Sequence, residues 1–191
     1  MPALRRPHLL ASLRPWIDVG SVGTMGLNFL EELWGAQPLG QLSTPGTFYD
    51  FTRYRPTIRI SEGQLEMRLP NTIMGYARGN EEQDWLFLHM LEPHSHGEEY
   101  VESVLEVMKY LDVCQYCLVG SMYAPVPHTR PPLISGIAST EPLQERLCQL
   151  GVREITYEGP TSVVSMLNTE AGQQGIEDLI VVLHTYPPTL S

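Results

Sequence analysis

The stretch 84-DWLFLHMLEPHSHGEEYVESVLEVMKYLDVCQYCLVGSM-122 decides the fold. Residues 84–91 form a continuous apolar run, which is typical of a strand covered on both faces. Residues 97–113 carry apolar side chains at helical spacing and acids in the first turn, which predicts an amphipathic helix. Residues 115–122 are a second apolar run. Strand, helix and strand in this order predict part of a mostly parallel sheet.

The same alternation continues toward the C-terminus. Strands are expected over 133–139, 152–159 and 178–187, and helices over 140–151 and 160–175. The first of these helices has Thr140 as a predicted cap and Gly151 just past its end.

The N-terminal part adds a strand and helix of its own. Residues 14–20 are expected to be a strand leading into a buried helix over 21–35, and 37–42 a short strand. Residues 57–79 alternate and are punctuated by Gly63 and Pro70, which predicts an antiparallel meander. We therefore expect a three-layer α/β/α sandwich with a mostly parallel mixed sheet and an antiparallel meander that extends or edges it.

Composition narrows the class of protein. A chain of 191 residues with 42% apolar and 18% charged side chains is expected to form one globular domain, 1–191. A net charge of −10 disfavours nucleic-acid binding, which depends on Lys and Arg. No run approaches the length of a membrane span. The apolar part of residues 1–16 is short and interrupted, unlike a secretion signal, and the odd number of cysteines forms no disulfide framework, so we expect a cytoplasmic protein without membrane contact.

Polar residues gather where the predicted strands end. In open α/β sheets ligands lie beyond the carboxyl ends of the strands, so four loops are expected to meet there as a ligand site. The ligand-binding candidates are Asp18, Gly20, Ser21, Gly23, Glu92, His94, His128, Arg130, Tyr157, Gly159 and Thr161.

Two of these segments precede helices. The glycines of 18-DVGSVGTMG-26 could let a helix N-terminus hold an anion, or serve a tight turn and close helix packing. The dinucleotide fingerprint would need glycine at Val22, and the lysine of a P-loop is absent. In 157-YEGPTSVVSML-167, Thr161 or Ser162 is either a helix cap or part of a second anion site.

No motif completes a metal or catalytic site. His94 and His96 in 92-EPHSHGEE-99 could bind a metal if extended, but the sequence places no third histidine there, and we expect a polar loop and no metal. Cys114 and Cys117 have redox spacing yet enter an apolar strand, which indicates packing. No complete catalytic motif is present, so we expect no cofactor and lean against an enzyme.

The loop 123-YAPVPHTRPP-132 has four prolines around His128 and Arg130. One interpretation is that the prolines hold these two side chains toward the crevice, opposite Asp18–Gly20 and near Glu92, where Arg130 would bind a carboxylate or phosphate. The alternative is that Arg130 pairs internally with Glu92 or Asp18 and stiffens the fold or an oligomer contact.

Several blocks resemble a known family. These are "WIDVGSVGTMGLNFL", "FYDFTRYRPTIRI", "LHMLEPHSHGEEYVESVLE", "VPHTRPPLISGIAS" and "YEGPTSVVSML". In this order they are similar to the proteasome assembly chaperone 2 family, and most to its prokaryotic members, over about residues 14–186. Many members continue with a further helical segment after the final strand, which has no counterpart in this sequence.

The resemblance implies a sandwich similar to nucleoside phosphorylases and a homo-oligomer, with a trimer favoured. It also implies a chaperone-like or scaffold protein that acts by self-association and by binding a protein partner. The alternative is a protein or enzyme that binds a nucleotide or phosphorylated metabolite in the phosphorylase-like crevice.

Overall fold

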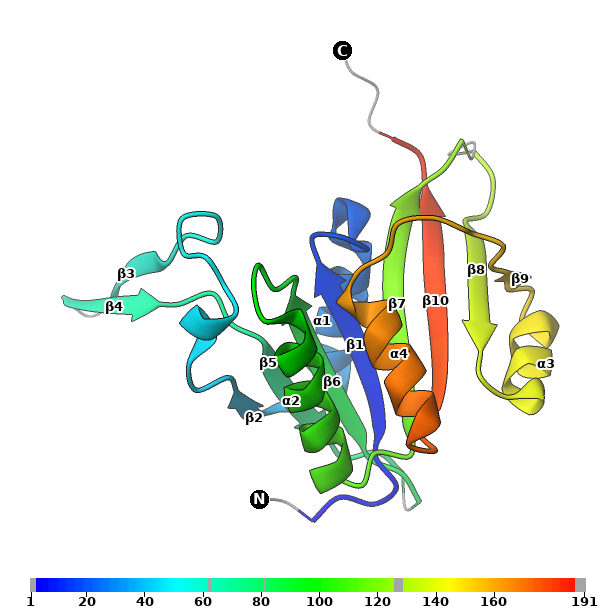
Figure 1. The fold of residues 1–191 in the computed structure, drawn as a ribbon, viewed down its shortest axis with the longest axis horizontal. Coiled ribbons are helices and arrows are strands. Elements are labelled where there is room, and N and C mark those ends of the chain that lie inside the picture. Colours follow the sequence, from blue (N-terminus) through cyan, green and yellow to red (C-terminus); the bar gives the residue numbers. More distant parts are fainter. Residues whose placement is uncertain (1–2, 62, 81, 126–128, 188–191) are drawn as a thin grey trace.

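The computed structural model describes residues 3–61, 63–80, 82–125 and 129–187 (Figure 1). The strands of its large sheet are β1 (His8–Arg14), β2 (Gln37–Gln41), β5 (Ile73–Ala77), β6 (Trp85–Leu91), β7 (Gln115–Tyr123), β8 (Leu133–Ala138), β9 (Arg153–Glu154) and β10 (Glu177–Thr185). They lie in the order β2-β5-β6-β1-β7-β10-β8-β9. The four central strands β6, β1, β7 and β10 are parallel. β2, β5 and β8 join antiparallel, so the sheet is mixed, as the sequence predicts.

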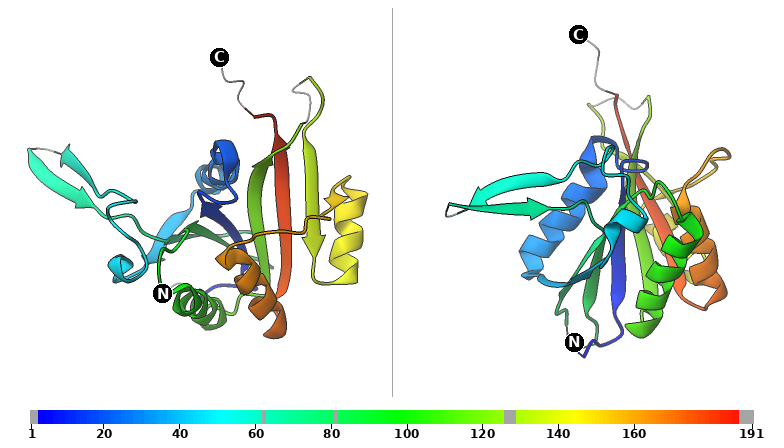
Figure 2. Two further views of the ribbon diagram at one scale, coloured as in Figure 1. Left: turned by 45° about the horizontal axis from the view of Figure 1, so that its top comes forward. Right: turned by 60° about the vertical axis from the view of Figure 1, so that its left-hand side comes forward.

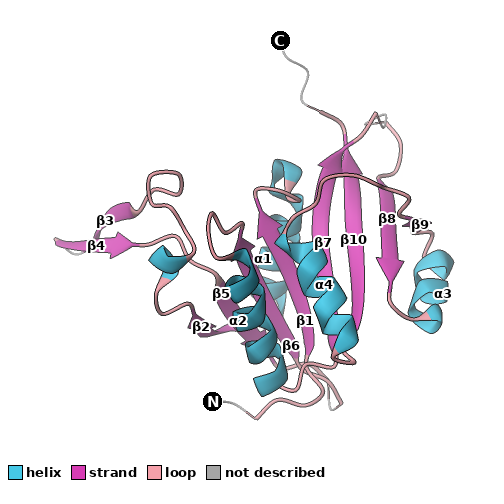
Figure 3. Cartoon of the chain, in the orientation of Figure 1, coloured by secondary structure: helices cyan, strands magenta, loops and turns pink. Residues whose placement is uncertain are grey.

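Helices cover both faces of this sheet. They are α1 (Val22–Trp34), α2 (Gly97–Tyr110), α3 (Glu141–Gln149) and α4 (Val163–Gln173). Figure 3 shows α2 and α4 in front of the sheet and α1 behind it. α3 packs at the edge formed by β8 and β9. The three-layer α/β/α arrangement is therefore confirmed.

The main core lies between the sheet and the helices α2 and α4. Apolar side chains at helical spacing on α2 reach it because they share one face of the helix. Its fully buried members include Leu9, Leu13, Leu86, Met90, Met108 and Leu118. A smaller cluster around Leu27 and Phe87 lies under α1.

The meander splits into two parts. β5 extends the large sheet between β2 and β6, whereas β3 (Thr57–Ser61) and β4 (Gln64–Arg68) form a separate two-stranded hairpin. Figure 2 shows this hairpin projecting away from the body of the molecule.

Three local predictions are wrong. The first strand is His8–Arg14 and not 14–20, because Pro15 has no N–H to offer a sheet ladder. Only Arg153 and Glu154 of 152–159 pair as a strand; the rest is a loop. The helix over 21–35 exists, but it is not buried all round, and the side chains of Met25, Phe29 and Leu33 are exposed.

Candidate functional site

In the glycine-rich turn before α1, the carboxylate of Asp18 is hydrogen-bonded within the turn and the start of the helix. Asp18 is buried, and its Oδ1 accepts a hydrogen bond from the backbone N–H of Thr24 at 3.2 Å. Its Oδ2 accepts one from the Thr24 hydroxyl at 2.6 Å. The start of α1 is thus already occupied by an anion, as at a capped helix end. Gly20, with φ of 64°, and Ser21, with φ of 57°, make the left-handed turn between Asp18 and the helix.

Gly23 allows α1 to approach β7 closely. A Cβ atom at this position would lie 2.6 Å from the carbonyl oxygen of Val119. Real Cβ atoms do not approach oxygen so closely, so any larger residue would push the helix away. This geometry matches the packing interpretation of the glycine segment.

Glu92, at the end of β6, holds the start of α4. Its carboxyl group lies near the backbone N–H of Val163, the first residue of that helix, and this N–H partly offsets the effect of burial on the pKa of the carboxyl. Burial raises the pKa of this carboxyl above its ordinary value. Its Oε2 is buried and has no hydrogen-bond partner among the described residues. Like Asp18, Glu92 serves a helix N-terminus.

The two histidines of the next loop have separate partners. Nδ1 of His94 accepts a hydrogen bond from the backbone N–H of Asp50 at 3.1 Å. Nδ1 of His96 lies 3.0 Å from Oε1 of Glu99. Within the described residues no group of three potential ligands is placed to hold a metal ion.

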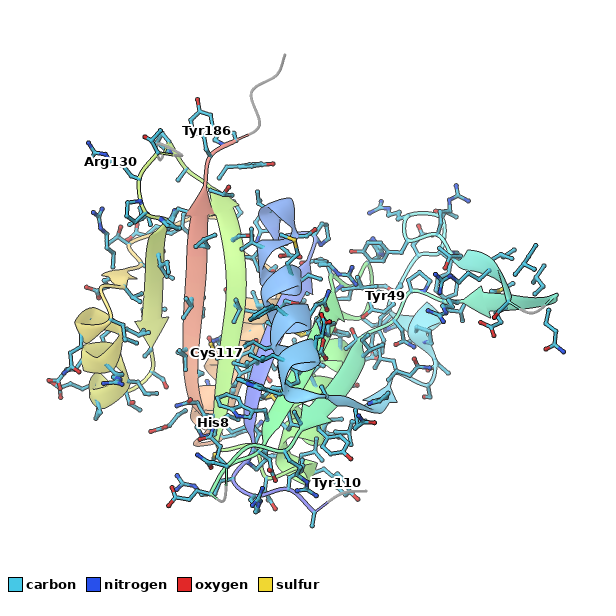
Figure 4. All side chains as sticks on the ribbon, turned by 180° about the vertical axis from the view of Figure 1, so that it is seen from behind. His8, Tyr49, Tyr110, Cys117, Arg130 and Tyr186 are labelled. Atoms are coloured by element: carbon cyan, nitrogen blue, oxygen red, sulfur yellow. The ribbon has the colours of Figure 1, made fainter. Side chains whose placement is uncertain are left out.

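The proline loop is described only in part. His128 lies outside the described residues. Figure 4 shows Arg130 at the outer end of the loop between β7 and β8, pointing away from the sheet, and the side chain is exposed. In the part of the chain that the structure describes, Arg130 forms no ion pair with Asp18 or Glu92. Its proposed roles stay predictions.

The segment before α4 folds onto itself. The Tyr157 hydroxyl donates to the Pro160 carbonyl at 3.0 Å, and the Tyr157 ring lies against Gly159. The hydroxyls of Thr161 and Ser165 are hydrogen-bonded to each other. Ser162 is the N-cap of α4, and its Oγ accepts from the Val164 N–H at 3.5 Å. Of the two predicted caps, Ser162 is therefore the one used.

The 153–161 segment covers a groove of about 610 Å³. Figure 1 shows the loop before α4, in orange, crossing in front of β7 and β10. The lining residues come from β7, β8, β10, the 153–161 segment, the start of α4 and the loop after β1, and include Trp16, Met122, Ser135, Arg153, Tyr157, Thr161 and His184. Of the sequence-predicted site residues, the groove brings together Tyr157 and Thr161.

A serine and a histidine that the sequence analysis did not single out lie inside the groove. The Oγ of Ser135, on β8, is 2.7 Å from Nε2 of His184 on β10. Burial, and then the positive charge of Arg153, lower the pKa of His184. The only sequence signal was a polar residue inside each of two apolar strands. Their meeting depends on the antiparallel register that pairs Ser135 with Val182, which one sequence does not give.

The comparisons with known proteins agree on one family. Residues 12–190 match the model described as the PAC2 family. None of the curated proteins matches the chain.

Solved structures support the same assignment. The chain is similar to a PAC2 family protein from Streptomyces avermitilis, with 25% identity and a TM-score of 0.84 over 94% of this chain and 76% of that one. A proteasome-assembly chaperone homologue from Mycobacterium tuberculosis is 24% identical, with a TM-score of 0.82 over 95% and 76% of the two chains.

An archaeal protein shares the fold at lower identity. Pyrococcus furiosus PbaB, an archaeal proteasome activator, is 15% identical, with a TM-score of 0.74 over 97% of this chain and 77% of that one. The family match extends over nearly the whole sequence and agrees with the resemblance found in its motifs, and the chain therefore belongs to the PAC2 family.

Proposed function

We propose that this protein is a chaperone-like assembly factor that acts as a homo-oligomer, preferably a trimer, and binds another protein through exposed apolar surfaces. Membership of the PAC2 family and the fold shared with proteasome-assembly chaperone homologues support this role. The observation that carries it is the β3–β4 hairpin.

The hairpin separates its side chains by polarity. Ile58 pairs with Met67 and Ile60 with Leu65 on one face, while Arg59 pairs with Glu66 on the other. The four apolar side chains are 59–78% exposed. A two-stranded hairpin is marginally stable in water without a surface to pack on, so this face favours a binding partner.

A second apolar surface lies on α1, the helix on the sheet face opposite α2 and α4. Met25, Phe29 and Leu33 follow one another on successive turns of α1 and are 56–64% exposed. Glu31 points from the opposite flank of α1 toward His89 of β6. The apolar stripe therefore lies on the flank of α1 away from β6, and Figure 4 shows β7 and then β10 on that side of α1, with no helix over β10.

Half-buried residues of β10 continue this stripe. Leu179, Val181 and Leu183 alternate with the residues that line the groove, and so lie on the face next to α1. We propose that the hairpin of one copy packs on the α1–β10 surface of the next. Such a head-to-tail contact closes into a ring when the rotation between copies fits.

Sedimentation velocity tests the self-association. The double variant Ile60→Ser, Leu65→Ser is expected to sediment as a monomer, while wild type sediments as an oligomer. Arg59→Ser, Glu66→Ser, on the polar face of the same hairpin, is the matched control and should remain oligomeric. Phe29→Ser should also dissociate the oligomer; if it does not, the hairpin packs elsewhere. A monomeric wild type would refute the proposal.

The client is proposed from the similar structures, which include proteasome-assembly chaperone homologues and an archaeal proteasome activator. We propose an α-type proteasome subunit of the same organism as the client. Purified unassembled subunit should bind the wild-type oligomer, whereas the completed particle should bind more weakly. No binding of either would reject this client and leave the self-association untouched.

We also propose that the protein works in the cytoplasm as one domain over 1–191. Cys114, Cys117 and Cys148 are free thiols, which fits a reducing compartment. Within the described residues, no helix is both long and apolar enough to cross a membrane.

A further inference from the structure

We propose that the groove under the 153–161 segment is a binding site for a small amphipathic monoanion: an aliphatic or aromatic body carrying one carboxylate or sulfonate. This goes beyond the assembly role and uses other surfaces. The groove encloses about 610 Å³, within the range of small-molecule pockets.

Apolar side chains form the floor of the groove. Leu118 of β7 and Ile180 and Val182 of β10 lie side by side on the sheet face beneath the segment. Trp16 and Met122 add further apolar wall. An aliphatic or aromatic body placed here removes its own apolar surface and that of the floor from water.

The polar pair sits within this apolar surrounding. Ser135 is 8% exposed, and its hydroxyl lies 2.7 Å from Nε2 of His184. When the serine hydroxyl donates to Nε2, the neutral imidazole carries its proton on Nδ1. No hydrogen bond to Nδ1 is formed by any described residue, so this N–H remains available to a ligand.

Arg153 supplies the charge. It lines the groove from β9, close enough for its charge to act on His184. In the described part of the chain its guanidinium forms no ion pair. A guanidinium without an acid partner, beside an apolar floor, is suited to a carboxylate or sulfonate with an apolar body. The groove contains no lysine-bearing glycine loop that would favour a polyphosphate instead.

The geometry does not make Ser135 and His184 a hydrolytic pair. A nucleophile needs an oriented base and donors for the oxyanion. Among the described residues no acid is hydrogen-bonded to His184. The pair is therefore assigned to recognition.

Octanoate and 1-octanol are the probes, and isothermal titration calorimetry of the full chain is the measurement. Octanoate is expected to bind once per chain and more tightly than 1-octanol. Arg153→Gln should weaken octanoate roughly tenfold, the loss of one charge-assisted hydrogen bond, and leave 1-octanol unchanged. Arg146→Gln, an exposed arginine of α3 outside the groove, is the matched control and should bind as wild type.

A second variant locates the site. Ile137 lines the groove and is 42% exposed, so Ile137→Trp can fill the groove without entering the core. It should abolish binding of both probes, whereas Ile60→Ser, Leu65→Ser should leave binding unchanged. Absence of octanoate binding to wild type, unaltered binding to Ile137→Trp, or loss of binding in the hairpin variant would each overturn the proposal.

Discussion

The carboxyl group of Glu92 lies near the backbone N–H of Val163, so the end of β6 meets the first turn of α4. The two residues are far apart in the sequence and belong to different layers. Asp18 and Thr24 form the same kind of contact at the start of α1. Two acids that the sequence marked for a ligand therefore hold helix N-termini, which are the groups an external anion would have used.

Glu92→Gln is expected to be more stable than wild type at pH 7. The raised pKa means that the ionised carboxyl is disfavoured in the folded state, and this cost is present above the folded pKa and disappears as the pH falls below the unfolded pKa. The gain is roughly 0.5 kcal/mol, since water screens a half-buried charge. Urea unfolding at pH 7 and pH 4 should show the gap closing at pH 4. Glu106→Gln, exposed on α2, should show no such trend.

Two alanine variants on α1 should move stability in opposite directions. Gly23→Ala brings a Cβ to 2.6 Å from the Val119 carbonyl oxygen and is expected to cost roughly 1–3 kcal/mol. Gly26→Ala meets nothing within 4 Å and should stabilise by about 1 kcal/mol through helix propensity. Thermal and urea unfolding measure both. Equal effects would mean that α1 does not pack on β7 at Gly23.

Asp84→Asn should destabilise the protein, because Asp84 holds the N-terminal segment through Arg5. The Asp84 carboxylate is buried and accepts hydrogen bonds from Arg5 Nη2 at 2.7 Å and Arg78 Nη1 at 2.8 Å. We expect a loss of roughly 1.5–3 kcal/mol at pH 7. Hydrogen bonds, first of all from Arg5, hold the pKa of this carboxyl well below its usual range.

The sign of the pH effect follows from that depressed pKa. The stabilisation by Asp84 is complete above the unfolded pKa and is lost as the pH falls toward the folded one. The difference between wild type and Asp84→Asn should therefore shrink when urea unfolding is repeated from pH 7 down to pH 3. Glu82→Gln, an exposed neighbour, is the control. A difference that stays constant with pH would contradict the ion-pair assignment.

His184 should make the protein less stable in mild acid. Its pKa is lowered by burial and by Arg153, so the unfolded chain binds the proton more readily and stability falls as the pH drops through the unfolded pKa. In His184→Gln, whose side-chain oxygen can still accept from Ser135, the loss of stability between pH 7.5 and 5.5 should be smaller than in wild type. Parallel melting-temperature profiles of the two proteins would refute this.

The alternation of strands and helices was predictable because each element shows its own period. The apolar run of β6, the amphipathic stripe of α2 and the apolar run of β7 need no knowledge of the rest of the chain. β1 was missed because its segment, His8–Arg14, lies between two prolines and beside arginines. It forms because β6 and β7 pair with it on both sides.

Two features were not predictable from one sequence: the exposure of apolar side chains on α1 and the existence of the groove. An apolar residue at helical spacing, such as Phe29, gives the same sequence pattern whether it packs against this chain or against another protein. The contact of Ser135 with His184 depends on strand register across residues almost fifty apart. Arg130 lies at the outer end of the loop between β7 and β8, and its predicted role in the crevice stays a prediction.

The central place of β1 has a consequence for synthesis on the ribosome. Leu9, Ala11 and Leu13 are fully buried, but the strands beside them end only at Leu91 and Tyr123. At about 5–20 residues per second, β1 waits roughly 5–20 s for β7 to be translated. During that interval the nascent chain carries an unpaired apolar strand, so we expect it to be a ligand for chaperones at the exit tunnel.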